Sequence, residues 1–306
     1  MIAGFLAFIR TGLEVATENP LIEFLRNNEF NRDVTLSGQG VAVSRREVTV
    51  NERGNNVRLR SFGQLTFSGV LVKDNWVLTA ASCFEGLRVC SCSLCLRSIK
   101  CTIISRNYNS SLWAAVLHDL SSTTVDPGEE VIYVESIFLY GGFKRGNFQN
   151  NIALVKLKSP ETPDTQLPTP ACVANGTEDL TTDCIIAGWG STRPVEAPSD
   201  ILRKVKVKLM SYQDCVRQQD RVMASISVGQ LCVISADDSK AAETSETEGP
   251  CTGDRGSPVL CKTKERWSVV GVVSDEYACR SNQQTTPMVV DVAHFSFWIN
   301  KIMSQF

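Results

Sequence analysis

The segment "CTGDRGSPVLC", residues 251–261, is the stretch from which the fold of this chain can be argued. Two cysteines enclose a Gly-Asp pair, an arginine and a Gly-Ser-Pro sequence that leads into an apolar run. Such surroundings are typical of a turn that presents a nucleophile. The centre of the turn, however, is Arg255, and a guanidinium is not a nucleophile.

Strand-like segments make up most of the chain around this turn. From about Arg58 onward, short runs rich in valine, isoleucine and threonine recur between turn signals, with few helical periods between them. This pattern predicts an all-β fold, built as one barrel or a pair of barrels. The carboxyl end differs, because four apolar residues there have helical spacing and predict one amphipathic helix that docks on the barrels. These residues are Phe295, Trp298, Ile299 and Ile302.

Length and charge limit the classes of function. The 306 residues, 43% of them hydrophobic, suffice for one large domain or two medium ones with packed cores. The net charge of −2 argues against a nucleic-acid partner and against a heparin-binding surface, although it leaves room for a local basic patch.

The two ends of the chain and two insertions suggest how it is divided. We expect a leader at residues 1–40, whose apolar start "MIAGFLAFI" is shorter than the roughly 20 residues that span a bilayer. It is a weak signal peptide, an incomplete amino terminus or a short amphipathic helix. No other segment is long enough for a transmembrane helix. Residues 41–306 form the main domain, with a cysteine-rich insertion at 83–112 and an acidic loop at 235–249, both expected to be exposed.

Several spaced motifs resemble those of the chymotrypsin-like serine proteases. They are "NWVLTAASCF" (75–84), "NNIALVKLKSP" (150–160) and the opening segment, supported by "IIAGWGST", "WSVVGVVS" and "FWINKIM". The resemblance covers roughly Val41 to the end. It implies two six-stranded antiparallel barrels with a carboxyl-terminal helix and with the former active site in the cleft between the barrels.

The family's chemistry needs a serine nucleophile, a histidine that takes its proton and an aspartate that orients the histidine. The resemblance places Ser82 at the histidine position, Asn151 at the aspartate position and Arg255 at the serine position. All three roles are therefore unfilled. The two histidines of the chain, His118 and His294, are expected at a surface loop and on the terminal helix.

The resemblance also assigns the positions around the triad. The backbone N–H groups of Gly253 and Arg255 stand where the family has its oxyanion hole. Gly249 stands at the base of the specificity pocket, and Ser274, Asp275 and Glu276 stand on its wall. We hypothesise that the Arg255 guanidinium pairs with Asp275 or Glu276 and plugs the cleft. The alternative is that Arg255 points to water.

Activation by cleavage is also altered. In the family, a cut after a basic residue frees an apolar amino terminus that pairs with the aspartate corresponding to Asp254. Here Gly40 precedes Val41, so the basic residue is missing at the cut.

Twelve cysteines and two glycosylation sequons, at Asn109 and Asn175, suggest export to an oxidising compartment. The resemblance implies the bridges Cys184–Cys261, Cys215–Cys232 and Cys251–Cys279, whereas Phe67 occupies the partner position of Cys83. Six cysteines have no inherited pairing, and they form either local disulfides, which we favour, or a zinc site. They are Cys83, Cys90, Cys92, Cys95, Cys101 and Cys172.

These observations predict a secreted, catalytically inactive serine-protease homologue that acts by protein binding, without a cofactor or metal. Its partners would be active serine proteases or their substrates, and it would act as a cofactor, decoy or regulator in a proteolytic cascade. A glycan-binding or microbe-binding homologue is the alternative. An active endopeptidase would need a replacement nucleophile and base.

Overall fold

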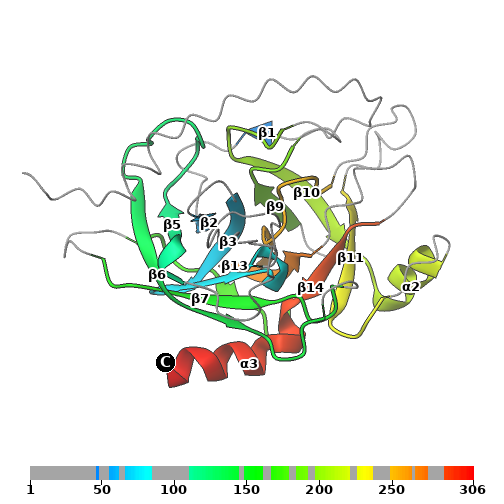
Figure 1. The fold of residues 1–306 in the computed structure, drawn as a ribbon. Helices are drawn as coiled ribbons and strands as arrows, with labels where there is room; N and C mark the ends of the chain where they lie inside the picture. Colours follow the sequence, from blue (N-terminus) through cyan, green and yellow to red (C-terminus); the bar gives the residue numbers. More distant parts are fainter. Residues whose placement is uncertain are drawn as a thin grey trace, which may run out of the picture. The chain divides into compact units, whose positions relative to one another are not determined.

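The strands of the amino-terminal half close into a barrel. The computed structural model describes residues 46–47, 55–61, 66–84, 110–144, 148–160, 167–178, 184–191, 197–220, 226–236, 249–263, 266–274 and 286–306. The first barrel has the strand order β2-β3-β4-β7-β6-β5, and all its pairs are antiparallel (Figure 1). Its strands are β2 (Asn56–Ser61), β3 (Thr66–Lys73), β4 (Trp76–Thr79), β5 (Trp113–Leu117), β6 (Glu130–Leu139) and β7 (Ala153–Leu157).

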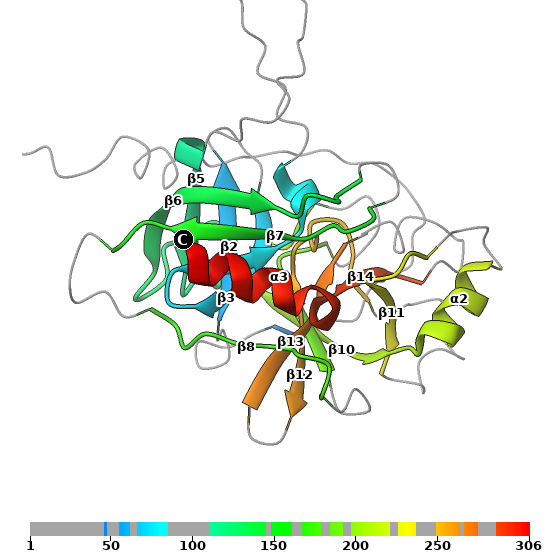
Figure 2. The same cartoon turned by 90° about the horizontal axis from the view of Figure 1, so that it is seen from below.

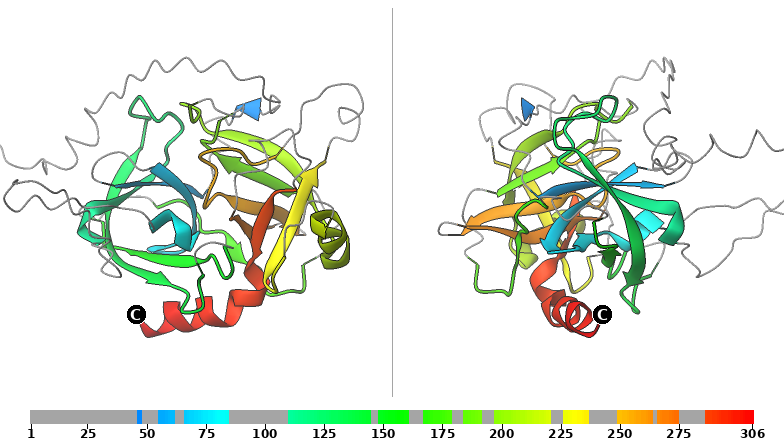
Figure 3. Two further views of the ribbon diagram at one scale, coloured as in Figure 1. Left: turned by 45° about the vertical axis from the view of Figure 1, so that its right-hand side comes forward. Right: turned by 90° about the vertical axis from the view of Figure 1, so that its left-hand side faces the viewer.

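The carboxyl-terminal half closes into a second antiparallel barrel. Its order is β9-β10-β11-β14-β13-β12, and it closes because β12 also pairs with β9. These strands are β9 (Cys184–Gly188), β10 (Arg203–Leu209), β11 (Gln230–Ser235), β12 (Pro258–Thr263), β13 (Arg266–Val273) and β14 (Met288–Asp291). Two short strands lie outside the ring, β1 (Arg46–Glu47) beside β10 and β8 (Cys172–Val173) beside β13. The predicted pair of six-stranded barrels is confirmed, and Figure 3 shows the two groups of strands separately.

Alternating side chains explain why these segments form barrel strands. In β10, "RKVKVKL", the valines are buried and the lysines between them are not. Successive side chains of a strand point to opposite faces, so the valines line the barrel interior. Where both faces are covered, as in β4 and β5, every residue is buried.

The predicted terminal helix is α3 (Val292–Gln305), which lies against both barrels (Figure 2). The Asp291 side chain caps it by accepting a hydrogen bond from Ala293 N–H at 3.1 Å. Phe295 is buried, and its ring meets that of Tyr140, which follows β6, at 5.0 Å. The other described α-helix is α2 (Tyr212–Asp220). No described helix has the length and apolar character needed to cross a bilayer.

The described ends of the cysteine-rich insertion correct one expectation. Cys83 and Phe84 belong to the 3-10 helix η2 (Ala81–Phe84) and are buried, so the insertion is not exposed at its first two residues. The reason is aromatic packing, because the Phe84 ring contacts Trp113 at 4.9 Å and Phe67 stacks near Trp113 at 6.2 Å. The short 3-10 helix η3 (Ser110–Leu112) ends the insertion, and residues 85–109 lie outside the described residues.

The acidic loop at 235–249, which we expected to be exposed, also departs from that expectation at its described ends. Ser235 is the last residue of β11, and Gly249 is buried. Residues 237–248 lie outside the described residues.

A buried ion pair stands where the two barrels meet. Arg58 of β2 pairs with Asp119, and both side chains are almost fully buried. The Arg58 guanidinium also lies 5.8 Å from the ring of Trp189, which follows β9. The Trp189 Nε1–H in turn donates to the Leu120 carbonyl at 3.1 Å. This contact joins the barrels through charge as well as through apolar packing.

Asp119 also lies in a cluster of three carboxylates. One oxygen of each of Asp119, Asp126 and Glu129 lies within 4.8 Å of the others. Asp126 is already engaged, since its carboxylate accepts from the N–H groups of Leu120 at 2.6 Å and Ser121 at 2.8 Å.

We expect Asp119 to make the free energy of unfolding depend on pH. Burial raises the pKa of its carboxyl to about 7, against the lowering effect of Arg58, whereas an unfolded aspartate titrates near 4. The folded state therefore binds this proton more tightly, and the resulting stabilisation is complete below about pH 4 and is lost as the pH rises through 7. Relative to Asp119→Asn, the wild-type protein should lose about 2 to 3 kcal/mol between pH 5 and pH 8, measured by urea unfolding.

Asp214→Asn is the matched control for this experiment. Asp214 is exposed on α2, and hydrogen bonds from Ser211 and Arg217 lower the pKa of its carboxyl. It therefore stays ionised throughout the tested range, so Asp214→Asn and wild-type curves should run parallel. Parallel curves for Asp119→Asn and wild type would contradict the proposed titration.

Candidate functional site

The three positions expected for the triad come from both barrels. Ser82 lies in η2, which begins two residues after the end of β4, and Asn151 lies two residues before the start of β7. Because β4 pairs with β7, these two segments of the first barrel meet. Arg255 lies in the turn before β12, and Ser274 directly follows β13, so the second barrel supplies both.

The fully buried side chain of Asn151 links Ser82 to Ser274. Its Oδ1 accepts a hydrogen bond from Ser82 N–H at 2.7 Å. Its Nδ2 lies 2.9 Å from Ser82 Oγ, 3.0 Å from Ser274 Oγ and 3.3 Å from the Ser274 carbonyl oxygen. One amide therefore joins hydroxyls from the two barrels. From the sequence we expected Ser274 only on the wall of the specificity pocket. No sequence pattern predicted its hydrogen bond with Asn151.

The direction of these hydrogen bonds decides what the network can do. A carboxylate only accepts, and it would hold a donor group in position, as the aspartate of a catalytic triad holds its histidine. The Asn151 amide instead donates to both hydroxyl oxygens. Among Ser82, Asn151 and Ser274, none can take a proton near neutral pH.

Arg255 is half-buried and lies against an aromatic ring. Its guanidinium carbon is 5.5 Å from the centroid of the Phe148 ring, within the range of a cation–π contact. The Phe148 carbonyl accepts from Gln230 Nε2 at 3.3 Å, and Gln230 is buried at the start of β11. Sequence reasoning missed Phe148. The expected partners Asp275 and Glu276 lie outside the described residues.

The backbone of the Arg255 turn is fixed by close contacts with the first barrel. The Arg255 carbonyl accepts from Ser68 N–H at 3.3 Å and from the buried thiol of Cys83 at 3.8 Å. Gly256 has φ of +84°, and a Cβ there would stand 2.2 Å from the Ser68 carbonyl oxygen. Glycine is therefore required beside Arg255, whatever residue occupies the nucleophile position.

Asp254 is completely buried, and backbone amides hold its carboxylate. It accepts from Gly190 N–H at 3.0 Å and from Cys251 N–H at 2.7 Å. A Cβ on Gly190 would lie 2.3 Å from the carboxyl carbon, so this approach also requires glycine. The expected partner of Asp254, a freed amino terminus, falls on residues outside the described ones.

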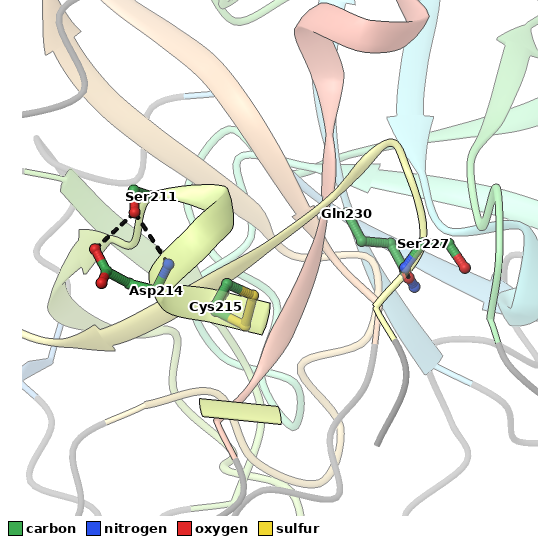
Figure 4. The surroundings of a disulfide bond; sticks show 6 residues. Ser211, Asp214, Cys215, Ser227 and Gln230 are labelled. Carbon is green, nitrogen blue, oxygen red and sulfur yellow. Dashed lines mark hydrogen bonds between the residues drawn. A yellow bond between two sulfur atoms is a disulfide. The ribbon is translucent and has the colours of Figure 1, made fainter. Parts of the chain in front are cut away.

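The described disulfides lie in the second barrel. Two of the three expected bridges are present, Cys184–Cys261 and Cys215–Cys232. Figure 4 shows the second, at the start of α2, where Asp214 N–H donates to Ser211 Oγ at 3.1 Å. Cys251 is disulfide-bonded, and its expected partner Cys279 lies outside the described residues.

The remaining predicted residues divide between described and undescribed parts of the chain. Gly253, two residues before Arg255, has φ of +96°. Cys172 is a half-buried thiol in β8, and Asn175 is exposed, its Oδ1 accepting from Thr177 Oγ1 at 2.7 Å. His118 follows β5 and His294 is exposed on α3, so neither lies on the elements that carry the three triad positions. Asn109, Cys90, Cys92, Cys95 and Cys101 lie outside the described residues.

Comparison with known proteins agrees with this architecture. The sequence model of the family described as Trypsin matches residues 42–299. The chain belongs to the trypsin family. A curated relative in this comparison is vitamin K-dependent protein C of Rattus norvegicus, 24% identical over 296 residues. The match covers 92% of this chain and 56% of that protein, so the chain spans about half the length of this relative.

We expect Asn151→Leu to destabilise this trypsin-family fold. Leucine has a similar volume, but it leaves Ser82 N–H and the two hydroxyls without the amide in a buried site. Such losses cost about 1 to 3 kcal/mol per group that finds no other partner. The free energy of unfolding should fall by about 2 to 4 kcal/mol in urea titrations.

Asn300→Leu is the control, because Asn300 is exposed on α3. It should change the free energy of unfolding by less than about 0.5 kcal/mol. If both substitutions had the same small effect, the amide of Asn151 would not hold the two barrels together.

Proposed function

We propose that this member of the trypsin family is catalytically inactive and acts by binding other proteins. The observation that carries the proposal is the Asn151 amide, which donates to Ser82 Oγ and Ser274 Oγ. A serine becomes a nucleophile only beside a base, and the network around Ser82 offers a donor instead. Replacing the triad carboxylate by an amide alone costs about 10⁴ in turnover in a related enzyme.

The position expected for the nucleophile supports the same proposal. Arg255 brings a permanent positive charge, which can neither attack a carbonyl nor accept a proton. Its guanidinium lies over Phe148, so side chains of the protein itself occupy this part of the site. Gly249 at the expected pocket base would recruit no cationic substrate side chain.

The proposed role is that of a secreted cofactor, decoy or regulator in a proteolytic cascade. Two packed barrels, the second of them stapled by disulfides, can present recognition loops independently of any catalytic group. The disulfides and the exposed sequon at Asn175 support an extracellular location and glycosylation. The proposed organisation is a leader at residues 1–40 followed by one protease-like domain at 41–306.

The proposal predicts no reaction with an active-site probe. Wild-type protein incubated with a fluorophosphonate should remain unlabelled, because the reagent needs an activated serine hydroxyl. Active trypsin, treated in parallel, is the positive control. Labelling of the wild-type protein that disappears in Ser82→Ala would contradict inactivity, since it would identify Ser82 as an activated nucleophile.

The protein-binding role predicts a retained partner. When immobilised wild-type protein is exposed to the extracellular fluid of its source, it should retain an active trypsin-family protease or a substrate of one, identified by mass spectrometry. Adding soluble protein should then change kcat/KM of that protease at least threefold. A reduced and alkylated sample, which lacks the disulfides, is the control. Retention and rate changes equal to that control would contradict the role.

A glycan-binding role is the second candidate. The observation that favours it is the exposure of Lys206 and Lys208 on β10.

A further inference from the structure

Phe297 of α3 is the most exposed large apolar residue among the described ones, with 81% of its surface open to solvent. The helix does not use it for docking, because its buried residues are Val292, Phe295 and Ile299. Phe295 and Ile299 lie two positions from Phe297, and side chains two apart on a helix do not share a face. A single exposed apolar residue needs no explanation by itself, so its surroundings decide whether it has a role.

The sequon at Asn175 lies beside the same helix. Its middle residue, Gly176, approaches α3 so closely that a Cβ on it would stand 3.8 Å from the Cβ of Ala293. Ala293 and Phe297 are four residues apart, so their Cβ atoms are about 5 to 6 Å apart on one face of the helix. Figure 2 shows the segment that contains β8 running alongside α3. Phe297 therefore lies one helical turn beyond the point where the sequon approaches α3.

Hydrogen bonds fix the turn that carries the sequon, and Asn175, Gly176 and Thr177 are all exposed. Asn175 Oδ1 accepts from Thr177 N–H at 3.1 Å and from Thr177 Oγ1–H at 2.7 Å. The Glu178 carboxylate accepts from the N–H groups of Asn175 at 3.0 Å and Gly176 at 2.9 Å. Within the Asn175 amide these bonds use only the oxygen. The Nδ2 atom, which carries the sugar in an N-linked glycan, lies outside them.

We propose that an N-linked glycan on Asn175 lies over the ring of Phe297 and covers it. The inference rests on the proposed glycosylation of Asn175 and does not depend on catalytic inactivity. The first sugars of an N-linked glycan are N-acetylglucosamine residues, whose ring faces carry C–H groups. The negative face of an aromatic ring attracts such groups, and the contact removes apolar surface from water. Because the turn is held next to α3, the first sugars begin close to this ring.

The test compares thermal unfolding of the secreted full chain before and after enzymatic removal of its N-linked glycan. Every sample carries Asn109→Gln, which leaves Asn175 as the single sequon of the chain. In this parent protein, removal of the glycan should lower Tm by about 2 to 4 °C, the size expected for one modest contact in a domain of this length. In Phe297→Ser the same treatment should lower Tm by less than about 1 °C. Phe297→Tyr keeps an aromatic ring and should show the loss of the parent protein.

Val125→Ser is the matched control for Phe297→Ser. Val125 is also an exposed apolar residue, 59% open to solvent, but it lies on the loop between β5 and β6 of the first barrel. Removal of the glycan should lower the Tm of Val125→Ser by as much as that of the parent protein. The enzyme that removes the glycan converts Asn175 to aspartate in every glycosylated variant alike, so the added charge cancels in the comparison.

Three results would overturn the proposal. Equal losses of Tm in Phe297→Ser and the parent protein, or no loss in either, would show that the glycan does not stabilise the fold through this ring. Equal losses together with weaker retention of a protein partner by Phe297→Ser would assign Phe297 to a protein interface instead. A mass that glycan removal leaves unchanged would overturn both the contact and the glycosylation of Asn175. The proposed inactivity would still stand or fall on the fluorophosphonate experiment alone.

Discussion

The side-chain amide of Asn151 is the contact on which the cleft of this protein depends. It is fully buried and binds Ser82 from one barrel and Ser274 from the other. Buried polar groups are costly unless each finds a partner. Here one amide bonds to a backbone N–H and to two hydroxyls. The two barrels thus meet around an amide and two hydroxyl groups.

The turn that carries Arg255 keeps its shape for reasons unrelated to catalysis. Gly256 packs against the Ser68 carbonyl so closely that no side chain fits, and Asp254 is held by the N–H groups of Gly190 and Cys251. These constraints act on the backbone whatever side chain occupies position 255. An arginine can therefore stand in a turn of this shape, and its contact with Phe148 places its charge within the protein's own surface.

Much of the fold follows from spaced motifs, because strands, turns and cysteines leave local patterns in a sequence. Side-chain contacts between residues far apart in the sequence leave none. The Arg58–Asp119 pair joins residues 61 positions apart, and neither residue belongs to a periodic pattern that marks it as buried. The ring of Phe148 beside Arg255 was missed for the same reason. The prediction for Cys83 was wrong because it rested on composition. The cysteine-rich insertion at 83–112 was expected to be exposed, whereas aromatic packing buries its first residues.

The most direct measurement of the central claim is peptide hydrolysis by purified wild-type protein, followed by mass spectrometry on a diverse peptide mixture. The account predicts the same cleavage rate with wild-type protein as with Arg255→Ala, both equal to buffer alone. Hydrolysis by the wild-type protein that a single substitution in the cleft abolishes would contradict it.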